Sequence, residues 1–193
     1  MSLRLRALEI RVITELGPYG TRLLFQEGLV VLRGDNSSGK STCLAAILYA
    51  LGLEGLFIRS QDSPFPEAMT QRLKAGDNWV SVVESSVMLE FAGPDGNVIT
   101  TKRAVTGSND ARQLITVLFG AAVTGSDVAS LERRDYFVRV PVPQSESGFH
   151  FYLAKLLAFE LPLVPRFDGV PVPSIWNRCF RLCLLTNFVD GLV

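Results

Sequence analysis

The sequence lacks the features that would place it in a membrane or in a secretory pathway. Its 193 residues contain no apolar run of the roughly 18 to 20 residues that a membrane span needs, because Arg, Glu, Asp or Asn interrupts every candidate. No long apolar stretch follows the two Arg residues of MSLRLRALEI, so the start does not resemble a secretory signal. We therefore expect a soluble cytoplasmic protein.

An excess of charge of one sign is also missing. Lys and Arg together number 19, and so do Asp and Glu. No overall field would draw such a chain onto nucleic acid or anionic lipid, so any DNA contact must be local or lie in other sequence. Cysteine is scarce too: Cys43, Cys179 and Cys183 form no paired framework and no zinc ligand set. We expect these thiols to be reduced and structural.

Hydrophobic residues make up 48% of the chain, which is enough for a substantial core. The apolar pattern predicts strands at residues 3–13 and 23–25, and the continuous run 29–32 is typical of a buried strand with both faces covered. Leu44, Ile47, Leu48 and Leu51 recur at helical spacing and predict a buried helix from Ser41 to about Leu53.

The second half of the chain predicts an antiparallel layer. A β-hairpin is expected around the turn at residues 93–97, with a further strand at 136–140. Residues 111–119 are ambiguous between strand and helix. A polar surface excursion at 59–78 would hold one short helix at 67–73, and a helix at 149–159 would be capped by Ser145 or Ser147.

The motif with the clearest chemistry lies directly after the apolar run 29–32. Residues 34–41 read GDNSSGKS and fit G-x-x-x-x-G-K-[ST] at every fixed position. A strand before the loop and a helix after it is the order in which such a loop binds phosphate. The candidate nucleotide-binding residues are Gly34, Asp35, Asn36, Ser37, Ser38, Gly39, Lys40, Ser41 and Thr42.

Each residue type in this loop has a physical reason. Gly34 and Gly39 allow backbone conformations and close approaches that a Cβ would forbid, so N–H groups can point into an anion nest. The helix start adds a partial positive charge. Lys40, the candidate catalytic residue, would reach the β- and γ-phosphates of ATP, Ser41 would ligate Mg²⁺, and Thr42 would lie near the α-phosphate.

The stretch LVVLRGDNSSGKSTCLAAILYALGLEG, with Asn36, Ser38 and Thr42 beyond the basic motif, resembles the ABC-type heads of the SMC, RecF and RecN group of ATPases. The resemblance covers residues 3 to about 105. It implies an α/β P-loop NTPase fold, the N-terminal half of a head, with an antiparallel β layer and a buried helix after the P-loop. It also implies two heads that close around two ATP molecules, coupling to DNA in repair, chromosome maintenance or defence against foreign DNA, and often an inserted coiled coil.

Several groups that such a head needs are not evident in the sequence. The nearest candidate for a Walker B strand is residues 184–190, where Gly191 stands in place of the catalytic Glu. No signature helix is apparent, Gln144 is a candidate Mg²⁺-binding Gln, and we expect the lone His150 to pack or face solvent rather than act as the switch His. Hydrolysis is therefore expected only if a C-terminal half of the head or a second head completes the site.

Residues 174–193 differ in character from residues 1–173, the expected portion of the ATP-binding head. This tail reads as a truncation or frameshift, or as an ordinary short apolar helix. An alternative function is a small complete P-loop enzyme such as a nucleotide kinase, which would need an Arg-rich lid. The basic pairs available for a lid, Lys102-Arg103 and Arg133-Arg134, read as solvated strand ends. A GTPase is disfavoured because no N-K-x-D motif occurs, and a non-catalytic module that binds ATP structurally stays open.

Overall fold

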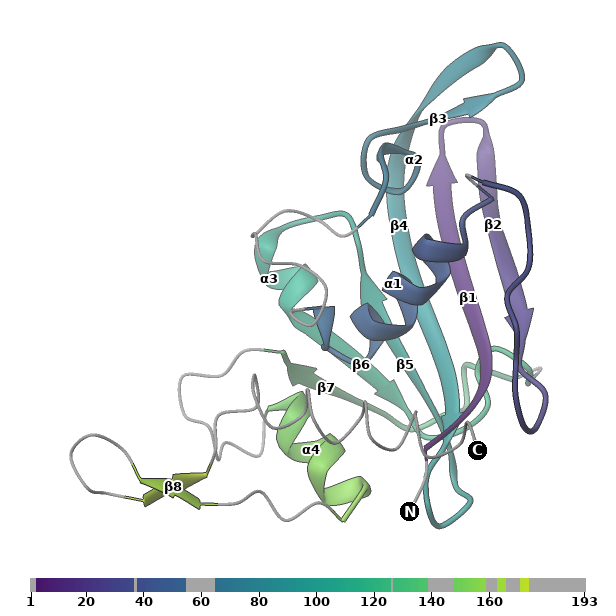
Figure 1. Cartoon of the computed structure of the whole chain (residues 1–193). Coiled ribbons are helices and arrows are strands. Elements are labelled where there is room, and N and C mark those ends of the chain that lie inside the picture. Colours follow the sequence, from purple (N-terminus) through teal and green to yellow (C-terminus); the bar gives the residue numbers. More distant parts are fainter. Residues whose placement is uncertain are drawn as a thin grey trace.

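The computed structural model describes residues 3–36, 38–54, 65–125, 127–138, 148–158, 163–165 and 171–173. They form a mixed α/β arrangement dominated by an antiparallel sheet (Figure 1). The strands are β1 (Arg4–Thr14), β2 (Gly17–Leu24), β3 (Arg72–Ala75), β4 (Asn78–Ala92), β5 (Val98–Ala104), β6 (Leu114–Leu118), β7 (Arg133–Phe137), β8 (Leu163–Pro165) and β9 (Pro171–Pro173). The helices are α1 (Lys40–Ala50), α2 (Glu67–Thr70), α3 (Asn109–Gln113) and α4 (Phe149–Leu156).

The main sheet has seven strands. Six of them follow the order β2-β1-β4-β5-β6-β7, and the seventh, β3, pairs with the N-terminal part of β4. Strands β8 and β9 pair separately. Every pairing between these described strands is antiparallel, and one isolated parallel bridge joins Phe137 to Gly148. The expected hairpin is confirmed as β4 and β5, joined by a turn at Gly96 with φ of 81°. The antiparallel β layer expected from the sequence is therefore present.

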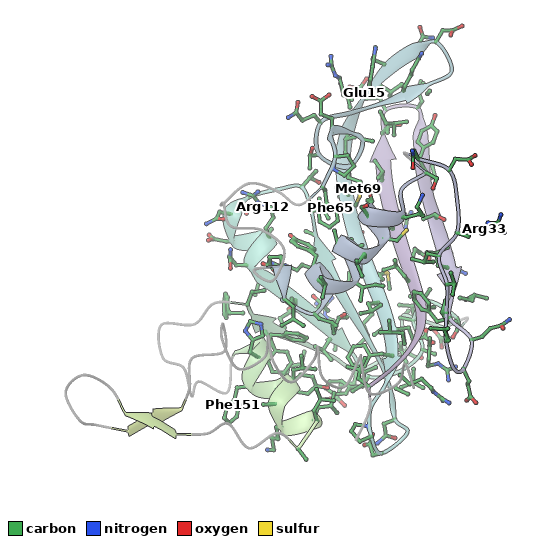
Figure 2. All side chains as sticks on the ribbon, in the orientation of Figure 1. Glu15, Arg33, Phe65, Met69, Arg112 and Phe151 are labelled. Carbon is green, nitrogen blue, oxygen red and sulfur yellow. The ribbon has the colours of Figure 1, made fainter. Side chains whose placement is uncertain are left out.

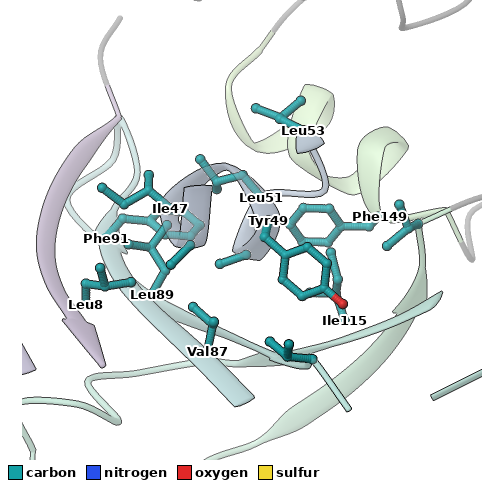
Figure 3. Packing of buried hydrophobic residues seen from close by; sticks show 14 of the residues in the cluster. Leu8, Ile47, Tyr49, Leu51, Leu53, Val87, Leu89, Phe91, Ile115 and Phe149 are labelled. Atoms are coloured by element: carbon teal, nitrogen blue, oxygen red, sulfur yellow. The ribbon is translucent and has the colours of Figure 1, made fainter. Parts of the chain in front are cut away.

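One face of the sheet forms the core. Leu8 of β1, Leu89 of β4 and Val117 of β6 are fully buried on this face, and α1 packs across β1, β4 and β5 (Figure 3). Residues 40–50 form a helix, as the spacing predicts, but its burial is uneven. Ile47 and Tyr49 are buried, whereas Leu44 in the first half is 44% exposed. The helix is thus buried at its C-terminal end and open at its N-terminal end.

Several element boundaries differ from the sequence-based expectation. Strand β2 begins at Gly17 rather than at residue 23, because the tight turn at 15–16 lets the Gly- and Pro-containing stretch pair with β1. The expected excursion at 59–78 contains α2, β3 and the start of β4. The turn between β3 and β4 uses Gly76 at φ of 63°. The ambiguous stretch 111–119 holds both alternatives, since α3 ends at Gln113 and β6 begins at Leu114.

The largest correction concerns residues 29–32, predicted as a buried strand. They lie outside every strand, and Leu29 and Val31 are 73% and 74% exposed, with Val30 at 40% and Leu32 at 38%. No backbone hydrogen bond links residues 29–33 to other described residues; the preceding link is from Phe25 N to Arg6 O at 2.8 Å. An apolar run becomes a buried strand only where neighbouring strands supply hydrogen bonds and cover, and here the described chain supplies neither.

Other expectations fall on residues that the structure does not describe. The tail 174–193, the candidate Walker B stretch 184–190, Gln144, Ser145 and Ser147 all lie outside the described residues, as does Ser37 of the loop. Helix α4 begins after Gly148 and ends at Leu156, close to the expected bounds. No helix within the described ranges is both long and apolar enough to cross a membrane.

Candidate nucleotide-binding site

Helix α1 begins directly after the loop at residues 34–39. Its N-cap is Gly39, at φ of 86° and ψ of 9°, a left-handed conformation that costs a residue with a Cβ more than it costs glycine. The first intrahelical bond runs from Cys43 N to Gly39 O at 2.9 Å. Earlier N–H groups of a helix have no partner inside it, and no side chain among the described residues caps them here. No acidic residue occupies the first turn. The helix start can therefore accept an anion.

The side chain of Lys40 folds back across this loop. Its Nζ donates to Gly34 O at 2.7 Å and to Asp35 O at 2.6 Å, with Ser38 Oγ at 3.5 Å. The ammonium group thus lies over the loop, held by carbonyls at its beginning. Gly34 allows the two ends of the loop to lie close together, because a Cβ on residue 34 would lie 2.6 Å from Ser38 Oγ. The three donors of the ammonium group face Gly34 O, Asp35 O and, at the longest distance, Ser38 Oγ, so a phosphate oxygen would take the place of one of these acceptors.

The other described residues of the loop and of the helix start are mostly exposed. Asp35, Asn36, Ser38 and Ser41 are exposed, Thr42 is half-buried, and Ser38 N donates to Asp35 O at 3.2 Å. The described residues contain no cluster of three or more His, Cys, Asp or Glu side chains that could hold a metal ion by themselves. A Mg²⁺ ion here would take one hydroxyl from Ser41, which fits a cation that usually keeps waters and phosphate oxygens as its other ligands.

The segment that enters the loop is open to solvent. Figure 2 shows Arg33, the residue before Gly34, projecting away from the sheet. Since residues 29–33 make no backbone hydrogen bonds to other described residues, they do not anchor the loop to the sheet. The loop is positioned chiefly by the helix that follows it.

A buried arginine, Arg103, holds the C-terminal end of α1. The sequence-based interpretation of the Lys102-Arg103 pair as a solvated strand end is wrong for Arg103. Arg103 of β5 is 2% exposed and donates to both carboxylate oxygens of Glu54 at 2.9 Å. Its Nη1 also donates to Tyr49 O and its Nε to Arg112 O, each at 2.8 Å. The guanidinium carbon lies 3.8 Å from the centre of the Tyr49 ring. We call Arg103, Tyr49 and Glu54 the Arg103 clamp.

The burial of Arg103 could have been predicted from the strand pattern. Ile99 and Val105 of the β5 region belong to the core, and period-two alternation places residue 103 on the same face. Lys102, on the opposite face, is exposed as expected, as are Arg133 and Arg134 of β7. Tyr49 OH donates to Ala104 O at 2.6 Å. Burial raises the pKa of Tyr49, the Arg103 charge lowers it and the Glu54 charge raises it again, for a net increase.

His150 packs against the loop that follows α1. Packing is one of the two placements expected for this residue, the other being exposure to solvent. Its Nε2 lies 2.9 Å from Gly52 O, and burial lowers its pKa despite this bond. It therefore lies at the C-terminal end of α1. The helix has 11 residues and is about 16 Å long at 1.5 Å per residue, so His150 is remote from the phosphate loop.

Comparison with known proteins finds a sequence similarity over part of this chain. The resemblance to the SMC group of ATPases that the loop indicates is confirmed over part of the sequence. Chromosome partition protein Smc of Gloeobacter violaceus (strain ATCC 29082 / PCC 7421) is 47% identical over 51 residues, which are 26% of this chain and 4% of that protein. The match thus spans a small fraction of its length.

No family model matches the chain. Among solved structures, a chain from work on ATP-driven dimerization and DNA-stimulated activation of SMC ATPases covers 98% of this chain and 99% of its own length. It has 17% sequence identity and a TM-score of 0.46, a likeness too low to establish a common fold.

Proposed function

We propose that this chain is the N-terminal portion of an SMC- or RecN-like ATPase head that binds ATP with Mg²⁺ through residues 34–42. The observation that carries the proposal is the position of Lys40 Nζ over the loop, beside an uncapped helix start. Together they offer a point charge and free N–H groups where a β- or γ-phosphate would lie. In this proposal the domain is a P-loop NTPase half, extending to residue 173.

The exposed run at residues 29–32 supports the proposal that this chain is only part of an ATPase head. Its side chains are apolar and its backbone makes no hydrogen bonds to other described residues, so both edges are open to further strands. A complete small enzyme such as a nucleotide kinase would be expected to bury the segment that enters its phosphate loop. We propose that a C-terminal half of the head, or a second head, covers this segment and brings the groups needed for hydrolysis.

The biological setting rests on resemblance. We propose a cytoplasmic protein that acts in chromosome maintenance, DNA repair or defence against foreign DNA, with DNA as a partner of the completed head. The balance of 19 basic and 19 acidic residues adds no electrostatic support for DNA binding by this chain alone.

Binding of a fluorescent ATP analogue in the presence of Mg²⁺ tests the first part. The wild-type chain should bind, and Lys40→Ala should bind at least tenfold more weakly, since a charge-assisted contact contributes about 1.5–3 kcal/mol. Lys102→Ala is the matched control, because Lys102 is an exposed lysine on the sheet face away from α1. Equal affinities for wild type and Lys40→Ala would refute the assignment.

Hydrolysis tests the second part. The isolated 193 residues should release phosphate no faster than Lys40→Ala does, even at saturating ATP and Mg²⁺. Robust turnover that depends on Lys40 would show that the chain is a complete enzyme and would contradict the half-head proposal while leaving nucleotide binding intact.

A further inference from the structure

The attachment of α1 to the sheet is polar at one end only. Among the described residues, each hydrogen bond between α1 and the sheet involves Tyr49: its hydroxyl donates to Ala104 O and its carbonyl accepts from Arg103 Nη1. The rest of the contact is apolar packing, in which the buried side chains Ala46, Ile47 and Tyr49 lie toward the C-terminal end (Figure 3). The N-terminal end, which carries the phosphate loop, has no such tether.

The segment that enters the loop gives it no backbone support within the described part of the chain. Residues 29–33 make no backbone hydrogen bonds to other described residues, so the direction of α1 decides where the loop lies relative to the sheet. We propose that the Arg103 clamp is the positioning element of the nucleotide site: it fixes the direction of α1 and so the placement of Gly39, Lys40 and Ser41. This inference rests on the proposed ATP binding and adds to it a set of residues remote from the phosphates.

Arginine suits this task better than lysine. One planar group reaches Glu54 with two parallel bonds, Tyr49 O with a third and Arg112 O with a fourth, while its face lies against the Tyr49 ring. An ammonium group cannot satisfy partners in so many directions from one point. The bond to Tyr49 O also places positive charge at the C-terminal end of α1, where the helix dipole favours it.

The test uses three clamp variants of the full chain. Arg103→Lys keeps the charge and removes the fork, Tyr49→Phe keeps the ring and removes the bond to Ala104 O, and Glu54→Gln removes the carboxylate charge. Because Arg103 is buried, its variant could unfold, and the two milder changes keep the question answerable. Glu90→Gln is the matched control: Glu90 is a buried carboxylate that pairs with an arginine, Arg6, as Glu54 pairs with Arg103, and it lies on the opposite sheet face.

Two measurements are made well below the melting transition of each variant. The clamp variants should bind the fluorescent ATP analogue about three- to tenfold more weakly, within the range typical of substitutions remote from a ligand. Without nucleotide, they should shift the backbone amide resonances of Gly34 and Gly39, in the loop that α1, about 16 Å long, separates from the clamp. Glu90→Gln should lower the melting temperature without either effect.

Clamp variants that melt earlier but keep wild-type affinity and unshifted loop amides would overturn the inference and leave a merely structural role for Arg103. A wild-type chain whose ATP binding is absent or insensitive to Lys40→Ala would overturn the proposed function instead. In that case the amide resonances still decide whether the clamp positions the loop. The two failures are therefore distinguishable.

Discussion

Substitution of the buried Glu90 by Gln should destabilise the chain by an amount that the structure allows us to work out. Glu90 is fully buried, and its Oε2 accepts from Val123 N at 3.0 Å and Thr124 N at 2.9 Å. Its Oε1 accepts from Arg6 Nε at 3.0 Å and from the Thr124 hydroxyl at 2.8 Å. A Gln amide can replace only one of these oxygens as an acceptor.

The less costly orientation keeps the amide oxygen toward the two backbone N–H groups. The NH₂ group then faces Arg6 Nε, and the Thr124 hydroxyl can rotate to accept. The loss is one charge-assisted bond, or about 1.5–3 kcal/mol. At about 2–4 °C per kcal/mol for a domain of this size, the melting temperature should fall by about 3–12 °C. Glu67→Gln is the control, because both side chains of the Glu67 pair with Arg72 are more than half exposed and the pair should contribute less than about 1 kcal/mol.

The pH dependence of stability tests this prediction in a second way. Burial alone would raise the pKa of Glu90, but the hydrogen bonds from Thr124, Arg6 and Val123 outweigh it and lower the pKa from 4.5. The charged form is therefore stabilised by folding, and this stability is present above about pH 4.5 and is lost as the pH falls through the folded-state pKa. Thermal melts of wild type and Glu90→Gln should differ by a constant amount at pH 6–8 and converge in acid. A difference that persists or grows in acid would refute the reasoning.

The other predictions concern the loop, the open segment and the lone histidine. Gly39→Ala should cost about 1–2 kcal/mol of strain and weaken ATP binding, whereas Gly76→Ala, at φ of 63°, should cost as much in thermal melts without affecting binding. Val31→Lys should change the free energy of unfolding by less than about 0.5 kcal/mol, whereas Val117→Lys should unfold the chain. Stability should fall as pH drops below about 6.5 and then level off, because burial lowers the pKa of His150, and His150→Asn should abolish this step.

Local patterns predicted much of this structure because they depend on neighbours in sequence. Period-two alternation identified β1 and the β4–β5 hairpin, and helical spacing with a preceding glycine identified α1. The motif identified a loop whose Gly39 adopts the left-handed conformation and whose lysine reaches back to Gly34 O. Each of these features depends on residues that are close together in the sequence.

What the sequence could not reveal depends on distant partners. The run at 29–32 has the composition of a buried strand, yet burial requires strands on both sides, and the described chain does not provide them. Arg103 was read as solvated because charged residues usually are, although its alternation with core residues pointed inward. Its partners Glu54 and Tyr49 lie 49 and 54 residues away, so no local pattern could name them.

These two features bear on the same question of what fixes the phosphate loop. A strand that enters a loop and a helix that leaves it would normally hold it from both sides. Here the entering segment makes no backbone bonds to the described chain, and the helix is tied at its far end by the clamp. Covering residues 29–32 with a further polypeptide would supply the second anchor. If the proposed half-head is completed in this way, ATP affinity should rise and become less sensitive to Arg103→Lys, so the penalty of that substitution should shrink when a complementing half is added.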